Sequence, residues 1–126
     1  MKFGMNASFS PGRPTVAEID LDALAFNYRQ IQRRVPKGVR ILGVVKADAY
    51  GHGAAPVARK LESLGVDYLG VAMADEGIEL RKGGVKAPIL VMGGFFEKEA
   101  DRVLAHGLTP VVFQRDSLES LSMAAR

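Results

Sequence analysis

The chain has 126 residues, of which 48% are hydrophobic and 25% charged, as in globular domains large enough to bury a core. Its 17 Lys and Arg are dispersed among 14 Asp and Glu, which argues against nucleic-acid binding, and its apolar runs are too short to cross a membrane. The sequence has no cysteine, which excludes disulfides, thiolate catalysis and cysteine-ligated zinc and suits the cytoplasm.

The first part of the chain predicts a leader, a strand and a helix. Residues 1–14 contain Gly, Asn, Ser and two Pro, and we expect a flexible leader there. Residues 15–21 alternate between apolar and polar side chains, which predicts a short strand. Asp22 is the expected N-cap of the helix that follows. Its apolar stripe recurs at helical spacing: Leu24, Tyr28, Ile31 and Val35.

A repeat of strands and helices fills the rest of the chain. Apolar runs at 41–45, 68–72, 88–92 and 109–113 predict strands, and helical patterns lie between them. The strands do not alternate, so we expect a parallel sheet buried on both faces. The helical patterns carry acids in the first turn, bases in the last and a glycine stop. This order predicts consecutive βα units of one α/β sheet.

Two architectures contain such units, the open doubly wound sheet and the (β/α)₈ barrel. The GxGxxG turn typical of many open sheets is missing after the run at 41–45. In the last helical pattern, Asp116 or Ser117 is the expected cap and Leu118, Leu121 and Ala125 are expected to face inward. The pattern stops at Arg126 without a glycine. Because a barrel needs about 250 residues, we predict that residues 15–126 form the first half of a (β/α)₈ TIM-type barrel.

Lys46 stands directly after the apolar run at 41–45, where parallel sheets place functional groups. Apolar surroundings disfavour an ammonium ion, and the neutral amine is a nucleophile that can form a Schiff base with an aldehyde. The alternative is a lysine that simply extends into solvent. Position alone favours this second interpretation.

The residues after Lys46 leave several roles open. Tyr50 can contact a cofactor phosphate, act as an acid or base, or cover an apolar edge. Gly51 and Gly53 permit close approach of the backbone to a ligand, and a helix beginning near residue 54 offers N–H groups to an anion. His52 has no partner at metal-ligand spacing, and a helix end explains His106, so we predict no metal site.

The string VVKADAYGHG, residues 44–53, closely resembles the pyridoxal-phosphate lysine signature of the alanine racemase family. The similarity covers residues 13–121, including the stretches RPTVAEIDLDALAFNYR, YLGVAMADEGIELRKGGVKAPILVMGG and HGLTPVVF. It implies a (β/α)₈ barrel followed by a β-rich C-terminal domain that this chain lacks. In this family the first strand joins that domain, so residues 15–21 are expected to lack their partners here.

The resemblance also implies roles for individual residues. Lys46 matches the lysine that binds pyridoxal 5′-phosphate covalently and moves the α-proton on one face of the substrate. Tyr50 matches a tyrosine near the cofactor phosphate, and Met92 falls where a leucine commonly touches the cofactor region, a mild departure. Tyr50 is rejected as the second base, which the family takes from a tyrosine of a partner subunit. Asp48 is given no role.

The expected function is therefore that of a cytoplasmic, homodimeric isomerase that interconverts L- and D-alanine for peptidoglycan. We expect this chain alone to be an inactive fragment that self-associates through open strand edges at 41–45 and 109–113. The alternatives are a related barrel-type amino-acid decarboxylase, a pyridoxal-phosphate carrier, and a non-catalytic self-associating folding unit. Neither nucleic acid nor a membrane is an expected partner.

Overall fold

The computed structural model describes residues 16–126, so the predicted leader at 1–14 lies outside the described residues. The elements follow one another as α1 (Leu21–Arg34), β1 (Leu42–Val44), α2 (Lys46–Gly51), α3 (Ala54–Ser63), β2 (Tyr68–Val71), α4 (Ala74–Lys82), β3 (Ile89–Val91), η1 (Glu97–Glu99), α5 (Ala100–Ala105), β4 (Thr109–Pro110) and α6 (Arg115–Ala124). None of the helices in this described part is long and apolar enough to span a bilayer.

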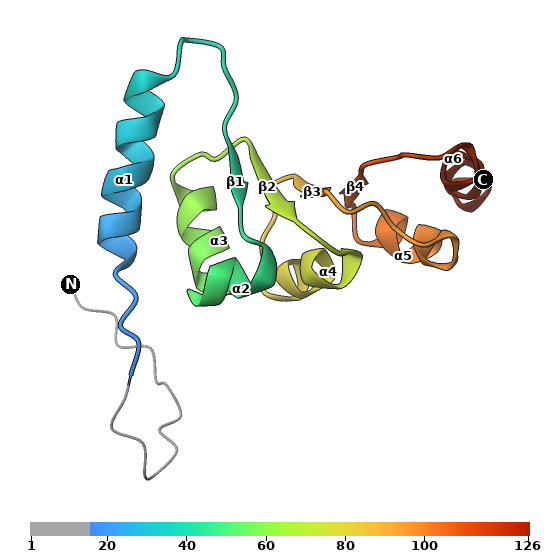
Figure 1. Cartoon of the computed structure of the whole chain (residues 1–126), viewed down its shortest axis with the longest axis horizontal. Coiled ribbons are helices and arrows are strands. Elements are labelled where there is room, and N and C mark those ends of the chain that lie inside the picture. Colours follow the sequence, from blue (N-terminus) through green and yellow to red (C-terminus); the bar gives the residue numbers. More distant parts are fainter. Residues whose placement is uncertain (1–15) are drawn as a thin grey trace.

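The four strands form one parallel sheet in the order β1-β2-β3-β4 (Figure 1). Val44 pairs with Gly70, and Gly70 pairs in turn with Leu90. Each strand therefore lies beside the next strand along the chain, and helices form the connections, as parallel pairing requires. The predicted α/β order and the parallel sheet are confirmed.

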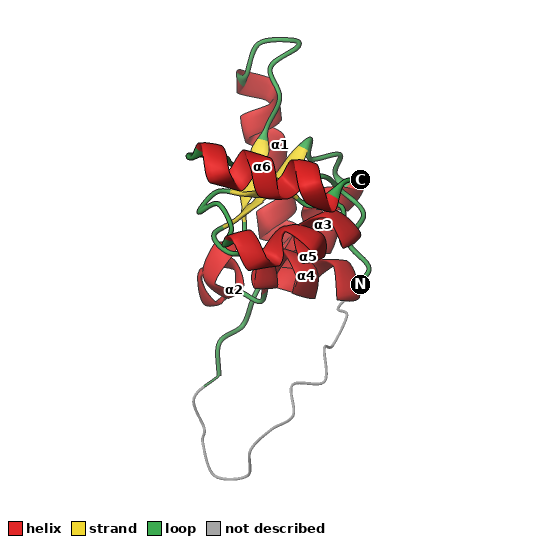
Figure 2. Ribbon diagram, turned by 90° about the vertical axis from the view of Figure 1, so that its right-hand side faces the viewer, coloured by secondary structure: helices red, strands yellow, loops and turns green. Residues whose placement is uncertain are grey.

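One face of the sheet is packed under helices α3, α4 and α5, which lie to one side of the strands (Figure 2). The strand side chains on this face are at most 1% exposed: Val45, Leu69, Val71, Ile89 and Val91. Gly43 belongs to the same face, because a Cβ built there would lie 3.0 Å from Leu61 Cδ1 of α3. This layer forms the hydrophobic core.

The opposite face of the sheet is open. Leu42 and Val44 are each 37% exposed, and Gly70 lies between Leu42 and Met92 on the same side. We call the surface formed by Leu42, Val44, Gly70 and Met92 the open face. The prediction that both faces are buried is therefore wrong within residues 16–126. Here α3, α4 and α5 cover a single face, whereas a closed barrel would fill the other with its own side chains.

The last strand is shorter than the predicted range of 109–113. Only Thr109 and Pro110 pair with β3, although Val111 N–H still donates to Val91 O at 3.0 Å. Proline has no N–H to donate, and no further strand lies beyond β4 in the described residues. As a result Phe113 is 71% exposed.

The described residues directly before α1 form no strand. Residues 16–20 have no regular structure and α1 begins at Leu21, so the strand predicted at 15–21 is absent from its described part. A strand needs a neighbour, and none pairs with this segment among the described residues. The predicted apolar stripe of α1 is only partly buried, with Tyr28 at 5% exposure and Ile31 at 50%.

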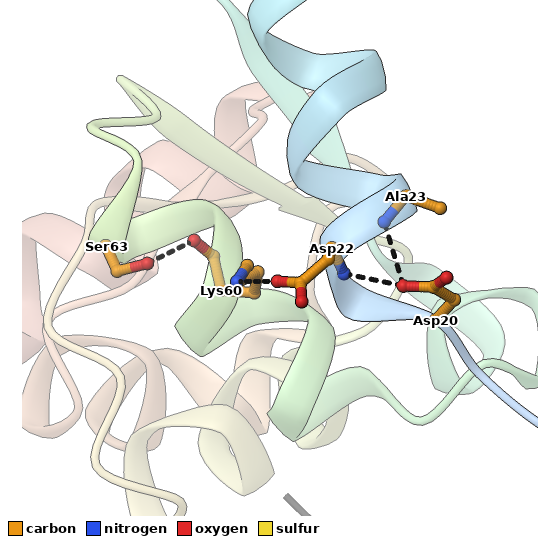
Figure 3. A network of polar contacts seen from close by, with 5 residues as sticks. All are labelled: Asp20, Asp22, Ala23, Lys60 and Ser63. Atoms are coloured by element: carbon orange, nitrogen blue, oxygen red, sulfur yellow. Dashed lines mark hydrogen bonds and ion pairs between the residues drawn. The ribbon is translucent and has the colours of Figure 1, made fainter. Parts of the chain in front are cut away.

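The N-cap of α1 is Asp20 rather than Asp22. Asp20 Oδ1 accepts from Asp22 N–H at 2.8 Å and from Ala23 N–H at 2.9 Å (Figure 3). Asp22 instead accepts from Lys60 Nζ at 3.0 Å, which links α1 to α3. The hydrogen bond and charge of Lys60 lower the pKa of Asp22 below its usual value. At the other end of the chain, Gln114 precedes α6, and neither Asp116 nor Ser117 is its cap.

The end of the sheet where strands begin, here called the amino edge, is held by two charged side chains. The guanidinium of Arg81 donates to the carbonyl oxygens of Val85, Ala87, His106 and Gly107 at 2.8–3.2 Å. Glu62 Oε1 accepts from the N–H groups of Lys86 and Ala87 at 2.6 and 2.5 Å. Burial lowers the pKa of Arg81, partly opposed by the charge of Glu62. These bonds tie the loops before β3 and β4 to the helices.

Candidate functional site

The opposite end of the sheet, here called the carboxyl edge, carries Lys46. Val45 extends the pairing of β1, since its N–H donates to Gly70 O at 2.8 Å, and it is 1% exposed. Lys46 follows immediately and is partly buried. Val44 belongs to the open face and Val45 to the helix-covered face, and the chain leaves the extended conformation at Val45, where ψ is 20°. The sequence-based position of Lys46 at a strand end is confirmed.

The segment after Lys46 is a left-handed helical turn. Ala47, Asp48, Ala49 and Tyr50 have φ between 50° and 55° and ψ between 37° and 52°. Non-glycine residues adopt this conformation at a cost of about 1–2 kcal/mol each, and normally one at a time. A run of such residues persists only where surrounding contacts hold it, and strain of this kind concentrates at functional sites.

Asp48 is one of the residues that hold this turn. Its carbonyl oxygen accepts from Gly53 N–H at 2.9 Å, and its carboxylate accepts from Ala54 N–H at 2.6 Å. Asp48 therefore closes the turn and bonds to the first residue of α3. The expectation that the helix near residue 54 offers its N–H groups to an anion is wrong for Ala54, because Asp48 already occupies that donor. The sequence interpretation gave Asp48 no role.

Glu76 holds the start of the turn from another element. Its Oε1 accepts from Ala47 N–H at 2.6 Å, and its Oε2 accepts from Ala72 N–H at 2.7 Å and Met73 N–H at 3.1 Å. One carboxylate thus joins the chain after β1 to the chain after β2. The sequence interpretation saw Glu76 only as an acid in the first turn of a helix. Its place at N3, the capping-box position, was a signal for the contact with Met73 but not for that with Ala47.

The other predicted site residues lie on both sides of Lys46. Tyr50 shares the left-handed turn and is 61% exposed. Met92 follows β3, two strands away, with its N–H donating to Val71 O at 2.9 Å. Gly70 lies between these strands, and a Cβ there would stand 3.3 Å from Met92 Sδ. The glycine therefore lets the side chains of Leu42 and Met92 approach each other over β2 on the open face.

The histidines are used locally. His52 Nδ1 lies 2.8 Å from Ala49 O, and His106 Nδ1 lies 2.8 Å from Arg102 O. Over residues 16–126, no group of three or more His, Asp or Glu side chains is arranged to hold a metal ion. A cavity of about 190 Å³ lies behind the turn, between Asp48 and Glu76, and Lys46 does not line it. The open face, rather than this cavity, is the candidate site.

Comparison with known proteins decides the family. Residues 19–126 match a family model described as alanine racemase, N-terminal domain. The chain belongs to the alanine racemase family. It is 46% identical over 113 residues to the alanine racemase of Geobacter sulfurreducens, which covers 90% of this chain and 30% of that protein.

Solved structures agree with the fold of this alanine racemase family member. The alanine racemase of Clostridium difficile 630 superposes with a TM-score of 0.87 at 40% identity, covering 92% of this chain and 30% of that one. An alanine racemase from Bartonella henselae with covalently bound pyridoxal phosphate superposes with a TM-score of 0.74 at 30% identity, covering 83% of this chain and 30% of that one. The prediction of a parallel α/β unit from the N-terminal barrel domain is confirmed, and the chain spans about 30% of the length of these relatives.

Proposed function

We propose that this chain provides the cofactor-binding lysine of a pyridoxal-phosphate-dependent alanine racemase, an isomerase that interconverts L- and D-alanine. The observation that carries the proposal is Lys46 at the carboxyl edge, directly before a strained left-handed turn. Family membership and the relative with covalently bound pyridoxal phosphate support it. The names of the relatives favour racemisation over decarboxylation.

The residues present suit this cofactor. Lys46 offers a primary amine to an aldehyde, and Gly70 lets Leu42 and Met92 form an apolar surface on the open face. Tyr50, exposed in the same turn, offers its phenol to a phosphate group. When bound, pyridoxal phosphate supplies an electron sink that makes the α-proton of an amino acid acidic.

The protein groups then have to move that proton. Lys46 accepts it at Nζ on one face of the substrate. Inversion needs a second group to deliver a proton to the opposite face. Tyr50 follows Lys46 in one turn and does not suit this role, so we propose that a tyrosine of a partner subunit provides it. In this proposal the chain alone does not racemise alanine.

Covalent labelling of the chain tests the lysine. After incubation with pyridoxal phosphate and borohydride reduction, peptide mass analysis is expected to find the label on Lys46. Lys60→Ala is the matched control, because Lys60 is partly buried but bonded to Asp22, and it should label as the unchanged chain does. Lys46→Ala should lose the label. Equal labelling of many lysines would contradict the assignment of Lys46. Racemisation by the chain alone would contradict the proposal that the second proton-transfer group comes from a partner subunit.

The open sheet predicts self-association of the chain with a second copy. Both edge strands, β1 and β4, lack a further neighbour among the described residues, and Leu42 and Val44 expose apolar surface beside one edge. An unpaired parallel edge next to such surface favours pairing with another chain. Sedimentation velocity over a range of concentrations should show dimers or larger species. A monomer at every concentration would exclude this interaction.

A further inference from the structure

The left-handed turn after Lys46 needs an explanation beyond its own sequence. Its φ angles of 50–55° occur at two alanines, an aspartate and a tyrosine, none of which is glycine. Ala49 N–H donates to Val45 O at 2.9 Å, and Asp48 bonds forward to Gly53 and Ala54. These contacts fix the middle and the end of the turn. They do not fix its first peptide, which directly follows Lys46.

Glu76 bonds to that first peptide. Its Oε1 stands 2.6 Å from Ala47 N, which is 29 positions away in the sequence. In a capping box the glutamate side chain bonds to the N-cap N–H, here that of Met73, and to no other element. The hydrogen bond from Ala47 N–H to Oε1 is therefore not explained by the stability of α4 alone. It ties the peptide after Lys46 to the end of the neighbouring strand.

We propose that Glu76 is a positioning residue for Lys46: by holding Ala47 N–H and the N–H groups of Ala72 and Met73 with one carboxylate, it fixes the direction in which the lysine leaves the strand. Charged acceptors make stronger hydrogen bonds than neutral ones, so this contact can offset part of the strain of the turn. The inference rests on the proposed covalent role of Lys46, and it assigns Glu76 to the backbone after Lys46 rather than to cofactor or substrate.

The substitution Glu76→Gln tests the proposal at constant size. A glutamine has one acceptor end and one donor end, so its NH₂ must face either the N–H of Ala47 or those of Ala72 and Met73. The matched control is Glu62→Gln at the amino edge, where one oxygen accepts from two backbone N–H groups and the amide can keep both bonds. Both substitutions remove one partly buried negative charge from a helix.

The readouts are the affinity for pyridoxal phosphate, followed by absorbance and by borohydride labelling of Lys46, and the hydrogen-exchange rate of the Ala47 amide in NMR. We expect Glu76→Gln to weaken covalent binding by about tenfold or more and to accelerate Ala47 exchange. Glu62→Gln should change neither by more than about twofold. Unchanged binding in Glu76→Gln, or an equal loss in both variants, would overturn the proposal.

Two further results separate this inference from the proposed function. If the unchanged chain forms no covalent link at Lys46, the proposed function fails. Faster Ala47 exchange in Glu76→Gln would still show that Glu76 holds the Ala47 N–H. If circular dichroism shows that Glu76→Gln is unfolded, Glu76→Asp replaces it. The shorter carboxylate keeps the charge but cannot reach all three N–H groups, so the same loss of binding is expected. Binding by a folded Glu76→Asp as in the unchanged chain would refute the role of Glu76.

Discussion

At both edges of the sheet, charged side chains bond to backbone groups, but the backbone that they hold differs in conformation. At the amino edge, Arg81 and Glu62 satisfy carbonyl and N–H groups of loops in ordinary conformations. At the carboxyl edge, Glu76 and Asp48 satisfy N–H groups of a turn that is strained. Charged side chains bonded to backbone occur at both edges. Only at the edge that carries Lys46 is the backbone they hold itself unfavourable.

A network of polar side chains bonded to backbone therefore does not by itself identify a functional site. The larger set of bonds, around Arg81, lies away from Lys46 and stabilises the fold. The edge that carries Lys46 is marked instead by positive φ angles that non-glycine residues rarely adopt. The two edges should therefore respond differently to substitution.

The largest expected effect on stability is at the amino edge. Arg81→Met keeps a long side chain but leaves several carbonyl groups without their donor, and we expect the free energy of unfolding to fall by about 2–4 kcal/mol. Arg59→Met is the control, because Arg59 donates only to Gly83 O among the contacts of the described residues, at 3.1 Å. Urea denaturation measures both. Equal losses would mean that the Arg81 network contributes little.

At the carboxyl edge a glycine should stabilise the chain. Ala47 has φ of 50°, which glycine adopts without strain, so Ala47→Gly is expected to raise the free energy of unfolding by about 0.5–1 kcal/mol. Ala23→Gly, in the first turn of the right-handed helix α1, should lower it by about the same amount. The opposite signs, measured by thermal and urea unfolding, distinguish the two kinds of backbone. A loss in both variants would show that the turn at Ala47 is not strained.

The smallest effect is expected at Tyr28. Its hydroxyl is buried without a hydrogen-bond partner among residues 16–126, so Tyr28→Phe should stabilise the chain by up to about 1 kcal/mol at neutral pH. Burial, and next the charge of Asp67, raises the pKa of Tyr28 above its usual value of 10.0. The unfolded chain then loses this proton first, so the stability of the unchanged chain should fall as the pH rises through about 10.

Urea denaturation at neutral and at alkaline pH measures this difference. The advantage of Tyr28→Phe should grow with pH, since phenylalanine does not ionise. A constant or shrinking difference would contradict the raised pKa of Tyr28.

Most of the fold was readable from the sequence because it depends on local patterns. The apolar runs predicted the order of the four sheet strands and of the helices between them, although the strand predicted at 15–21 is absent from its described part and the caps of α1 and α6 lie at other residues. Asp20 and Asp22 stand two positions apart before one helix, and both residue types cap well, so the pattern did not choose between them. The short β4 and the open face depend on what lies beside the strands, which a local pattern does not contain.

Less of the candidate site could be predicted from the sequence. Lys46 was found through its position and its motif, but the left-handed turn was not, because alanine, aspartate and tyrosine carry no signal for positive φ. The role of Glu76 depends on a contact across 29 positions. Its acidic character suited a helix N-terminus so well that no further explanation was needed. Long-range backbone contacts of this kind leave no pattern in a single sequence.

Helix α4 links the two edges of the sheet physically. Glu76 lies in its first turn and Arg81 in its last, so this short helix contributes side chains to both the carboxyl edge and the amino edge. Between them Gly77 lets the helix lie close to the strands, because an added Cβ would stand 3.0 Å from Leu108 and 3.4 Å from Ile89. An added methyl group there would press on the side chains of Leu108 and Ile89, which would have to shift for α4 to keep its contacts at both edges.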